Sequence, residues 1–169
     1  TVDAAKQLGY PLAVKAVGND LLHKSDLNAV RLGIADETDI RAAAADLVGL
    51  GECILVERMT ENPVCELILG MFMMIGFGGT LTEIFTDTRI VLMPTDREEI
   101  VEAVMSLRVA PLLTGHRGKP AGDLEGIVET VLAVQKFALD HCGKLIELDI
   151  NPLIVTPDGA VAVDALIIL

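Results

Sequence analysis

Residues 145–151 read Leu-Ile-Glu-Leu-Asp-Ile-Asn, so that oxygen-bearing side chains alternate with apolar ones. Side chains along a strand point to opposite faces in turn, and the alternation therefore predicts a strand with Glu147, Asp149 and Asn151 on one face. Carboxylate and amide oxygens are the ligands that Mg²⁺ prefers, and Mg²⁺ usually shares phosphate oxygens as well. The stretch predicts a site for a magnesium-nucleotide complex on a sheet. The alternative is a solvent-facing sheet whose polar face happens to be acidic.

A turn downstream adds a fourth candidate ligand. If Asp158-Gly159 is a two-residue turn, Asp164 is expected opposite Leu153, on the same face as Asn151 and diagonal to it. Diagonal neighbours lie about 7–8 Å apart by backbone, which is close enough for two side chains to share an ion. A three-residue loop would flip this register and separate the ligands.

The remaining pattern predicts an α/β (α+β) fold, with mixed sheets flanked by helices. Helical spacing and capping residues predict helices over residues 2–8, after a Thr38 cap, over about 97–107, and from Asp123 to Gly143. Short apolar runs predict strands over residues 12–17, 29–34, 53–56, 65–69, 71–75, 144–150, 153–156 and 160–168.

The composition excludes several classes of protein. A chain of 169 residues with 51% hydrophobic residues has ample material for a core, which argues against disorder. A net charge of −12 without a basic patch disfavours binding to nucleic acid or to anionic membranes. No apolar run is long enough to cross a bilayer, and the first residues do not resemble a signal peptide, so we expect a cytoplasmic protein. Three cysteines without CxxC spacing indicate buried thiols rather than a disulfide framework or a zinc site.

Several further motifs occur in a fixed order along the chain. They are Gly9-Tyr10-Pro11-Leu12-Ala13-Val14-Lys15, Leu22-His23-Lys24-Ser25-Asp26, Gly76-Phe77-Gly78-Gly79, Leu113-Thr114-Gly115-His116-Arg117-Gly118, Glu147-Leu148-Asp149-Ile150-Asn151-Pro152-Leu153 and Val163-Asp164-Ala165. Together they resemble the ATP-grasp half of ADP-forming acyl-CoA (acetyl-CoA) synthetases and, more distantly, the β subunit of succinyl-CoA ligase. The resemblance covers nearly the whole chain.

The resemblance implies a role for most of the candidate site residues. Lys15 resembles the strand lysine that holds nucleotide phosphates, which would explain a lone charge in an apolar run; the alternative is an edge lysine that reaches water. Val56 and Glu57 resemble the segment whose backbone meets adenine, and Glu66 resembles an acidic residue near the ribose. Gly76, Gly78 and Gly79 would let backbone amides approach a phosphate, although a glycine-rich turn alone is weak evidence. Among the metal candidates, Asn151 and Asp164 match the family ligands most closely, while Glu147 and Asp149 are expected to support them.

His23 resembles a loop histidine that carries a phosphoryl group between two sites. A neutral imidazole is nucleophilic near pH 7, and a mobile loop can carry the phosphorylated ring between distant centres. Most loop histidines have no such role, and this remains the alternative for His23. His116 and His141 are expected to be ordinary surface or structural residues.

The expected function is that of the nucleotide-binding part of an acyl-CoA synthetase (ADP-forming), an acid-thiol ligase that uses ATP/ADP and Mg²⁺. Residues 1–56 are expected to form an incomplete small lobe and residues 57–169 the C-terminal lobe. CoA and acyl phosphate would bind a module that is not in this chain, on a partner subunit or domain, and we expect an oligomer. The alternatives are a non-catalytic regulatory module of a protein acetyltransferase and another carboxylate-activating ATP-grasp ligase.

The chain departs from the family pattern at three points. Asn28-Ala29 stands where two glycines are usual, and Gly70 runs directly into Met71 where a loop of roughly ten residues is usual. Residues 50–51 show a similar shortening. Either the nucleotide lid has lost a part, or segments of a longer protein are absent from the sequence; we expect the second, together with a natural N-terminus elsewhere.

Overall fold

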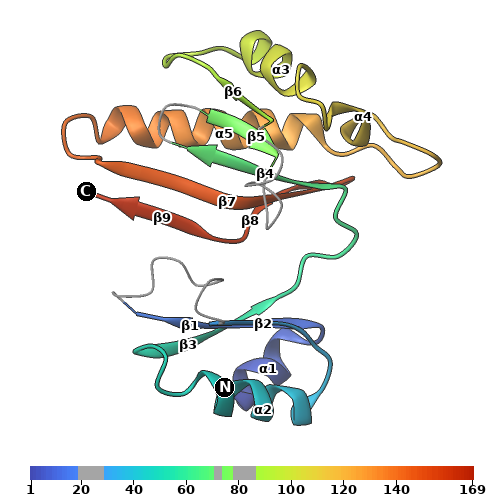
Figure 1. Cartoon of the computed structure of the whole chain (residues 1–169), viewed down its shortest axis with the longest axis vertical. Helices are drawn as coiled ribbons and strands as arrows, with labels where there is room; N and C mark the ends of the chain where they lie inside the picture. Colours follow the sequence, from blue (N-terminus) through green and yellow to red (C-terminus); the bar gives the residue numbers. More distant parts are fainter. Residues whose placement is uncertain (19–28, 71–73, 78–86) are drawn as a thin grey trace. The chain divides into compact units, whose positions relative to one another are not determined.

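A computed structural model describes residues 1–18, 29–70, 74–77 and 87–169 of the chain (Figure 1). The contacts divide these residues into two compact units, Thr1–Met59 and Thr60–Leu169. The sequence placed the boundary after residue 56, but β3 (Cys53–Arg58) continues to pair with β1 (Leu12–Val17) through Arg58 and so keeps the next residues with the first unit.

The first unit is a three-stranded antiparallel sheet with two helices on one face. It contains α1 (Val2–Leu8), β1, β2 (Val30–Ile34), α2 (Glu37–Leu47) and β3, with strand order β2-β1-β3 (Figure 1). Its core joins Ala5 of α1 and Ile40 of α2 to Leu12, Val14 and Ala16 of β1, as alternation along β1 requires. The other face of β1 therefore carries Ala13 and Lys15.

The N-terminus of α2 differs from the prediction of a Thr38 cap. Asp36 is the capping residue, and its Oδ1 accepts hydrogen bonds from the backbone N–H groups of Thr38 (2.7 Å) and Asp39 (2.9 Å). The Asp39 carboxylate in turn accepts from Ala35 N at 3.1 Å. Aspartate is a better helix cap than threonine, and the Asp36 carboxylate satisfies two of the four free N–H groups at the start of the helix.

The second unit is a larger antiparallel sheet covered on one face by helices (Figure 1). Its strand order is β6-β5-β4-β7-β8, and β9 also pairs with β7. The elements are β4 (Cys65–Gly70), β5 (Met74–Phe77), β6 (Thr88–Ile90), α3 (Arg97–Met105), α4 (Ala110–Leu113), α5 (Leu124–Asp140), β7 (Glu147–Thr156), β8 (Gly159–Ala162) and β9 (Ala165–Ile168). The core packs Ile100 and Val104 of α3 and the apolar face of α5 against alternate residues of β4 and β7.

The two long helices of this unit begin where the sequence predicts. Asp96 Oδ1 accepts from Glu99 N at 3.0 Å, and Asp123 Oδ1 accepts from Gly126 N at 3.0 Å. The helices end earlier than expected, at Met105 and Asp140. A buried amide links them: Gln135 of α5 accepts from Thr95 N (2.6 Å) and donates to Thr95 O (3.0 Å).

The C-terminal turn forms one step earlier than the sequence predicted. Thr156 pairs with Gly159, so the two-residue turn is Pro157-Asp158 rather than Asp158-Gly159. Proline favours the second position of a four-residue turn, and the Thr156 hydroxyl supports it by donating to Gly159 O at 3.1 Å. Leu153 therefore faces Ala162 instead of Asp164.

The strands differ from the prediction mainly at β5, β7, β8 and β9, and β6 was not predicted. β7 begins at Glu147 and runs without interruption through Asn151-Pro152, whereas the predicted run over residues 160–168 is divided between β8 and β9. β5 covers Met74–Phe77, and residues 71–73 of the expected strand lie outside the described residues. The helices that the structure describes include none with the length and apolar character that crossing a membrane requires.

Candidate functional site

Lys15 is a buried lysine in the middle of β1. Its neighbours across the sheet are Leu55 on β3 and Val30 on β2. Only 4% of the residue is exposed, so the alternative of an edge lysine that reaches water does not describe it. A buried ammonium requires a partner of opposite charge. The residues around Lys15 are therefore the first part of the site.

Glu57 provides that opposite charge. It pairs with Ala13 in the register of β1 and β3, diagonal to Lys15 and on the same face of the sheet. The two charged groups meet with Lys15 Nζ 2.7 Å from Glu57 Oε2. The Oε2 atom is inaccessible to solvent and contacts the ammonium as an ion pair, without the geometry of a hydrogen bond. Sequence reasoning named both residues but not their pairing, because that depends on the register between strands far apart in the chain.

The backbone of Val56 lies at the open edge of β3. Met59 N donates to Pro11 O (3.1 Å), and hydrogen bonding to a neighbouring strand alternates along an antiparallel pair. The polar backbone groups of Glu57 therefore point toward β1 and those of Val56 away from it. The Val56 side chain packs against the core of the first unit. Val56 can therefore bind a ligand only through its main chain. This agrees with the expected contact between the backbone of this segment and adenine.

The acidic strand keeps its alternation in the structure. Leu148 and Ile150 are buried beneath the helices, which places Glu147 and Asp149 on the opposite face of β7. The pairing of β7 with β4 then shifts by one residue, because Leu67 faces Leu153 whereas Leu69 faces Ile150. This irregularity lies at Asn151 and Pro152. Bulges of this kind re-aim side chains next to functional sites.

Asn151 and Asp164 lie directly across from each other. Asn151 N donates to Asp164 O (3.1 Å), and Val163 N donates to Pro152 O (3.1 Å). The predicted diagonal relationship is therefore replaced by a direct one. Because the turn forms one residue earlier, the partner of Leu153 changes from Asp164 to Ala162, a shift of two residues. A shift of two residues keeps Asp164 on the predicted face of the sheet and brings it closer to Asn151.

The carboxylates around this point repel one another. The pKa of Asp149 is raised above its usual value, first by burial and then by the charges of Glu147 and Asp164. Acidic groups gathered in this way favour either a proton or a cation. A bound divalent cation would relieve the repulsion.

The donor set suits magnesium held together with a nucleotide rather than a complete protein cage. Within the described residues, no three His, Cys, Asp or Glu side chains are placed as a ready-made metal site. Mg²⁺ commonly takes one or two carboxylates plus phosphate oxygens and water. Asn151 of β7 and Asp164 in the link between β8 and β9, flanked by Asp149, fit that pattern. Their role as ligands remains a prediction.

Glu66 and Gly76 occupy neighbouring strands of the second unit. Glu66 is half-buried on β4 and faces Ile154, on the face of the sheet away from the helices. Gly76 is buried within β5, and a Cβ there would lie 2.6 Å from Thr88 Cγ2 and 2.7 Å from Asp87 O. The glycine is thus needed for the close approach of β6. That packing gives it a structural reason in addition to the predicted contact with phosphate.

Three predicted residues, His23, Gly78 and Gly79, lie outside the described residues. The other two histidines are described. His141 stacks on Phe137 with ring centroids 4.2 Å apart, and its Nδ1 lies 2.9 Å from Phe137 O, which is a structural role at the end of α5. His116 is exposed on the loop after α4.

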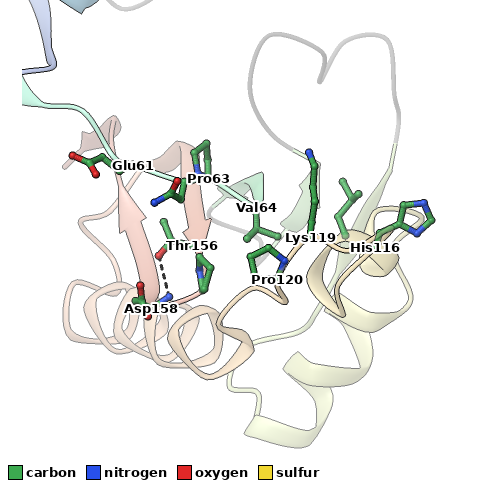
Figure 2. Close-up of a pocket in the computed structure, with 11 residues that line it drawn as sticks. Glu61, Pro63, Val64, His116, Lys119, Pro120, Thr156 and Asp158 are labelled. Atoms are coloured by element: carbon green, nitrogen blue, oxygen red, sulfur yellow. Dashed lines mark hydrogen bonds between the residues drawn. The ribbon is translucent and has the colours of Figure 1, made fainter. Parts of the chain in front are cut away.

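A pocket of about 610 Å³ opens elsewhere on the second unit (Figure 2). It is lined by residues 61–64, the end of α4, the loop that follows α4, and the turn at Thr156-Pro157-Asp158. None of the residues predicted for nucleotide or metal binding lines it. Sequence reasoning did not identify this pocket, because loops that are distant in the sequence build it.

The comparison with known families decides what this arrangement is. A model of the ATP-grasp domain matches residues 1–169, the whole chain. The chain belongs to the ATP-grasp family. The ion pair on a three-stranded sheet and the acidic strand of a larger sheet are accordingly features of an ATP-grasp chain, and the fold predicted from the sequence is confirmed.

Individual relatives show which ATP-grasp proteins the chain resembles. The ATP-grasp chain is 32% identical to the ADP-forming acetate–CoA ligase I of Archaeoglobus fulgidus over 184 residues, covering 99% of this chain and 26% of the relative. It is 30% identical to the β subunit of the ADP-forming acetate–CoA ligase I of Pyrococcus furiosus, covering 96% of this chain and 77% of the subunit. The chain thus spans about a quarter of one relative and about three quarters of the other.

A solved structure shares the fold closely. The dinucleotide-forming acetyl-coenzyme A synthetase 1 of Ca. Korarchaeum cryptofilum matches with a TM-score of 0.84 and 28% identity, over 99% of this chain and 80% of that one. That protein was solved in complex with coenzyme A and Mg-AMPPCP, with its phosphohistidine segment pointing towards the nucleotide-binding site.

Proposed function

We propose that this chain is the nucleotide-binding part of an ADP-forming acyl-CoA synthetase and that it moves a phosphoryl group between ATP/ADP and His23. The observation that carries the proposal is the buried Lys15–Glu57 pair in a chain that matches the ATP-grasp family over its whole length. A buried lysine on the face of the sheet opposite the helices would bind the phosphates of a nucleotide in this proposal, and no demand of the apolar core explains it.

Within this proposal, Lys15 binds and orients the phosphates of ATP. Its burial keeps water away and strengthens its attraction to negative charge. Glu57 holds the ammonium in position, and the backbone of Val56, at the free edge of β3, is available to adenine. Phosphoryl transfer needs little covalent chemistry from the protein, and most of the catalysis comes from such positioning.

Asn151 and Asp164 would hold Mg²⁺, with Glu147 and Asp149 beside them. When bound, the metal neutralises charge that develops on the transferring phosphoryl group. Glu66, half-buried on the same face of the sheet as Asp149, would contact the ribose. These assignments are supported by the matched relatives, which are ADP-forming CoA ligases, and by the neighbour solved with Mg-AMPPCP.

His23 is the proposed carrier. Its ring nitrogen takes the γ-phosphoryl group as the bond to the β-phosphate breaks, and ADP leaves. A carboxylate on the acyl module then takes the group to form acyl phosphate and frees the histidine. The CoA thiol takes the acyl group, and inorganic phosphate leaves. The acyl module and the CoA site lie on a partner subunit or domain outside this chain, and the Pyrococcus furiosus relative, a β subunit, supports such a division. We place the protein in the cytoplasm.

The test is acyl-CoA synthesis by the complete protein, comparing His23→Ala with His141→Gln. His23→Ala should abolish ATP-dependent acyl-CoA formation, whereas His141→Gln changes a histidine that stacks at the end of α5 and should retain it. If His23→Ala synthesised acyl-CoA at the rate of the unaltered protein, the carrier role would be wrong.

A further inference from the structure

The loop that follows α4 is an exposed turn with a defined shape. Its base is closed by a hydrogen bond from Gly122 N to Leu113 O (2.9 Å), and its tip by one from Lys119 N to His116 O (3.0 Å). The two residues at the tip, Arg117 (φ 51°) and Gly118 (φ 82°), both have positive φ, as in a type I′ turn. Residues 114–121, called here the basic loop, are all exposed.

Arg117 is an unusual residue for this position. Side chains other than glycine, asparagine and aspartate rarely adopt a positive φ, and doing so costs on the order of 1 kcal/mol or more. The exposed arginine contributes nothing to the core that would offset this cost. Such outliers cluster at binding sites, where the side chain is needed in spite of the backbone strain.

The basic loop concentrates positive charge in an acidic protein. Arg117 and Lys119 carry that charge, with His116 beside them, in a chain whose net charge is −12. None of the three forms an ion pair within the described part of the chain, in which Lys6, Arg41, Arg97 and Lys136 are paired with carboxylates while Arg108 and Lys144 are not. The charge of the loop is therefore available to an external anion.

The pocket beside the loop shows what kind of anion fits. In Figure 2, Lys119 and His116 stand on one side and extend in different directions, Glu61 and Asp158 lie on the other side, and Pro63, Val64 and Pro120 lie between them. The Lys119 ammonium and the His116 ring therefore do not converge on one small anion. They suit several carboxylates spread over a protein surface, with an apolar side chain seated between Val64 and Pro120.

We propose that the basic loop and the pocket form the docking surface for an acidic segment of the CoA-binding module. Carboxylates of that segment pair with Arg117 and Lys119, and an apolar side chain next to them enters the pocket. Because the turn is already formed, docking loses little conformational entropy, and opposite charges speed the encounter. This inference rests on the proposed function, since it takes that module as the partner.

A zero-length carbodiimide reagent, which joins an amine to a carboxylate in direct contact, tests the proposal on the complete protein. Lys119 should become joined to an Asp or Glu of the CoA-binding module. Lys144, an exposed lysine beyond the far end of α5, should not; the 17 residues of α5 separate it from the loop by about 25 Å. Arg117→Glu should lower the yield of the Lys119 product about tenfold, and Lys144→Glu should leave it unchanged.

Three results would overturn the proposal. Lys119 could react only with carboxylates of its own unit, such as Glu61 or Asp158, or of a second copy of this chain. Lys119 could form no more cross-link to the CoA-binding module than Lys144 does. Or inorganic phosphate could shield Lys119 from acetylation without any cross-link to the module, which would identify a site for a small anion.

The same samples separate this inference from the proposed function. Labelling of His23 by Mg-ATP does not require the basic loop, so it should persist in Arg117→Glu while acyl-CoA synthesis falls. If labelling occurs and the cross-link does not, only the docking surface is wrong. If labelling fails in the unaltered protein, the proposed function is wrong whatever the cross-link shows.

Discussion

Lys15 and Glu57 form an ion pair across two neighbouring strands, with Nζ 2.7 Å from Oε2. The lysine side chain is 6% exposed and that of the glutamate 33%. The glutamate therefore compensates the charge of the buried lysine, and under the proposed function the phosphates of ATP would add to that compensation.

Lys15→Met leaves the Glu57 carboxylate without its ammonium. Breaking a fully buried pair typically costs roughly 3–5 kcal/mol, and because Glu57 is partly exposed we expect a smaller loss of about 1–3 kcal/mol in the free energy of unfolding. The double variant Lys15→Met/Glu57→Gln should recover most of that stability but none of the binding of Mg-ATP. Urea unfolding and nucleotide titration measure the two effects. Equal stability of the single and double variants would show that the pair is unimportant.

The cap of α2 distinguishes the structure from the pattern in the sequence. Asp36→Ala should lower the free energy of unfolding by about 1 kcal/mol, because two N–H groups lose their acceptor. Thr38→Ala should change it by less than about 0.5 kcal/mol, as at an ordinary surface position. Urea unfolding of both variants is the measurement. A larger loss of stability in Thr38→Ala than in Asp36→Ala would show that Thr38 is the cap.

Gly76 should not tolerate a side chain. A methyl group there would lie 2.6 Å from Thr88 Cγ2 and 2.7 Å from Asp87 O, and overpacking of this kind costs about 1–3 kcal/mol. Gly159→Ala is the matched control: its Cβ would meet nothing within 4 Å, and its φ is not positive, so the change should be close to neutral. Thermal unfolding compares them. If the Gly76→Ala protein had normal stability but no longer bound ATP, Gly76 would be needed for ligand binding rather than for packing against β6.

Cysteine reactivity reports the core of the second unit. Burial raises the pKa of Cys65 to about 12, so at pH 8 about one thiol in ten thousand is ionised, and the thiolate is the reactive form. Cys53 and Cys142 are exposed, so the expectation of buried thiols is wrong for these two. In the native protein, iodoacetamide should modify those two and spare Cys65 until urea is added, as peptide mass spectrometry can show. Rapid modification of native Cys65 would mean that β4 opens from the core.

Local chemistry explains which parts of the fold the sequence predicts. The helices that Asp96 and Asp123 cap begin where the sequence predicts, since a cap depends on a few neighbouring residues. The alternation of Glu147 and Asp149 with buried Leu148 and Ile150 likewise depends only on the period of a strand. Such signals are contained within one element.

Relationships between elements were harder to predict. The turn at Pro157-Asp158 and the irregular pairing at Asn151 set the position of Asp164, and each depends on how a turn competes with the strand register. The pairing of Lys15 with Glu57 depends on the alignment of β1 with β3. The pocket beside Lys119 depends on three loops that meet only in the folded unit.

The most direct test of the proposed function is phosphorylation of the complete protein by ATP labelled in its γ-phosphate, in the presence of Mg²⁺. We expect a phosphoprotein that is labile in acid and stable in base, as a phosphorylated histidine is, with the label on residue 23 and absent from His23→Ala. No label on the unaltered protein, or a label equally strong in His23→Ala, would contradict the proposal.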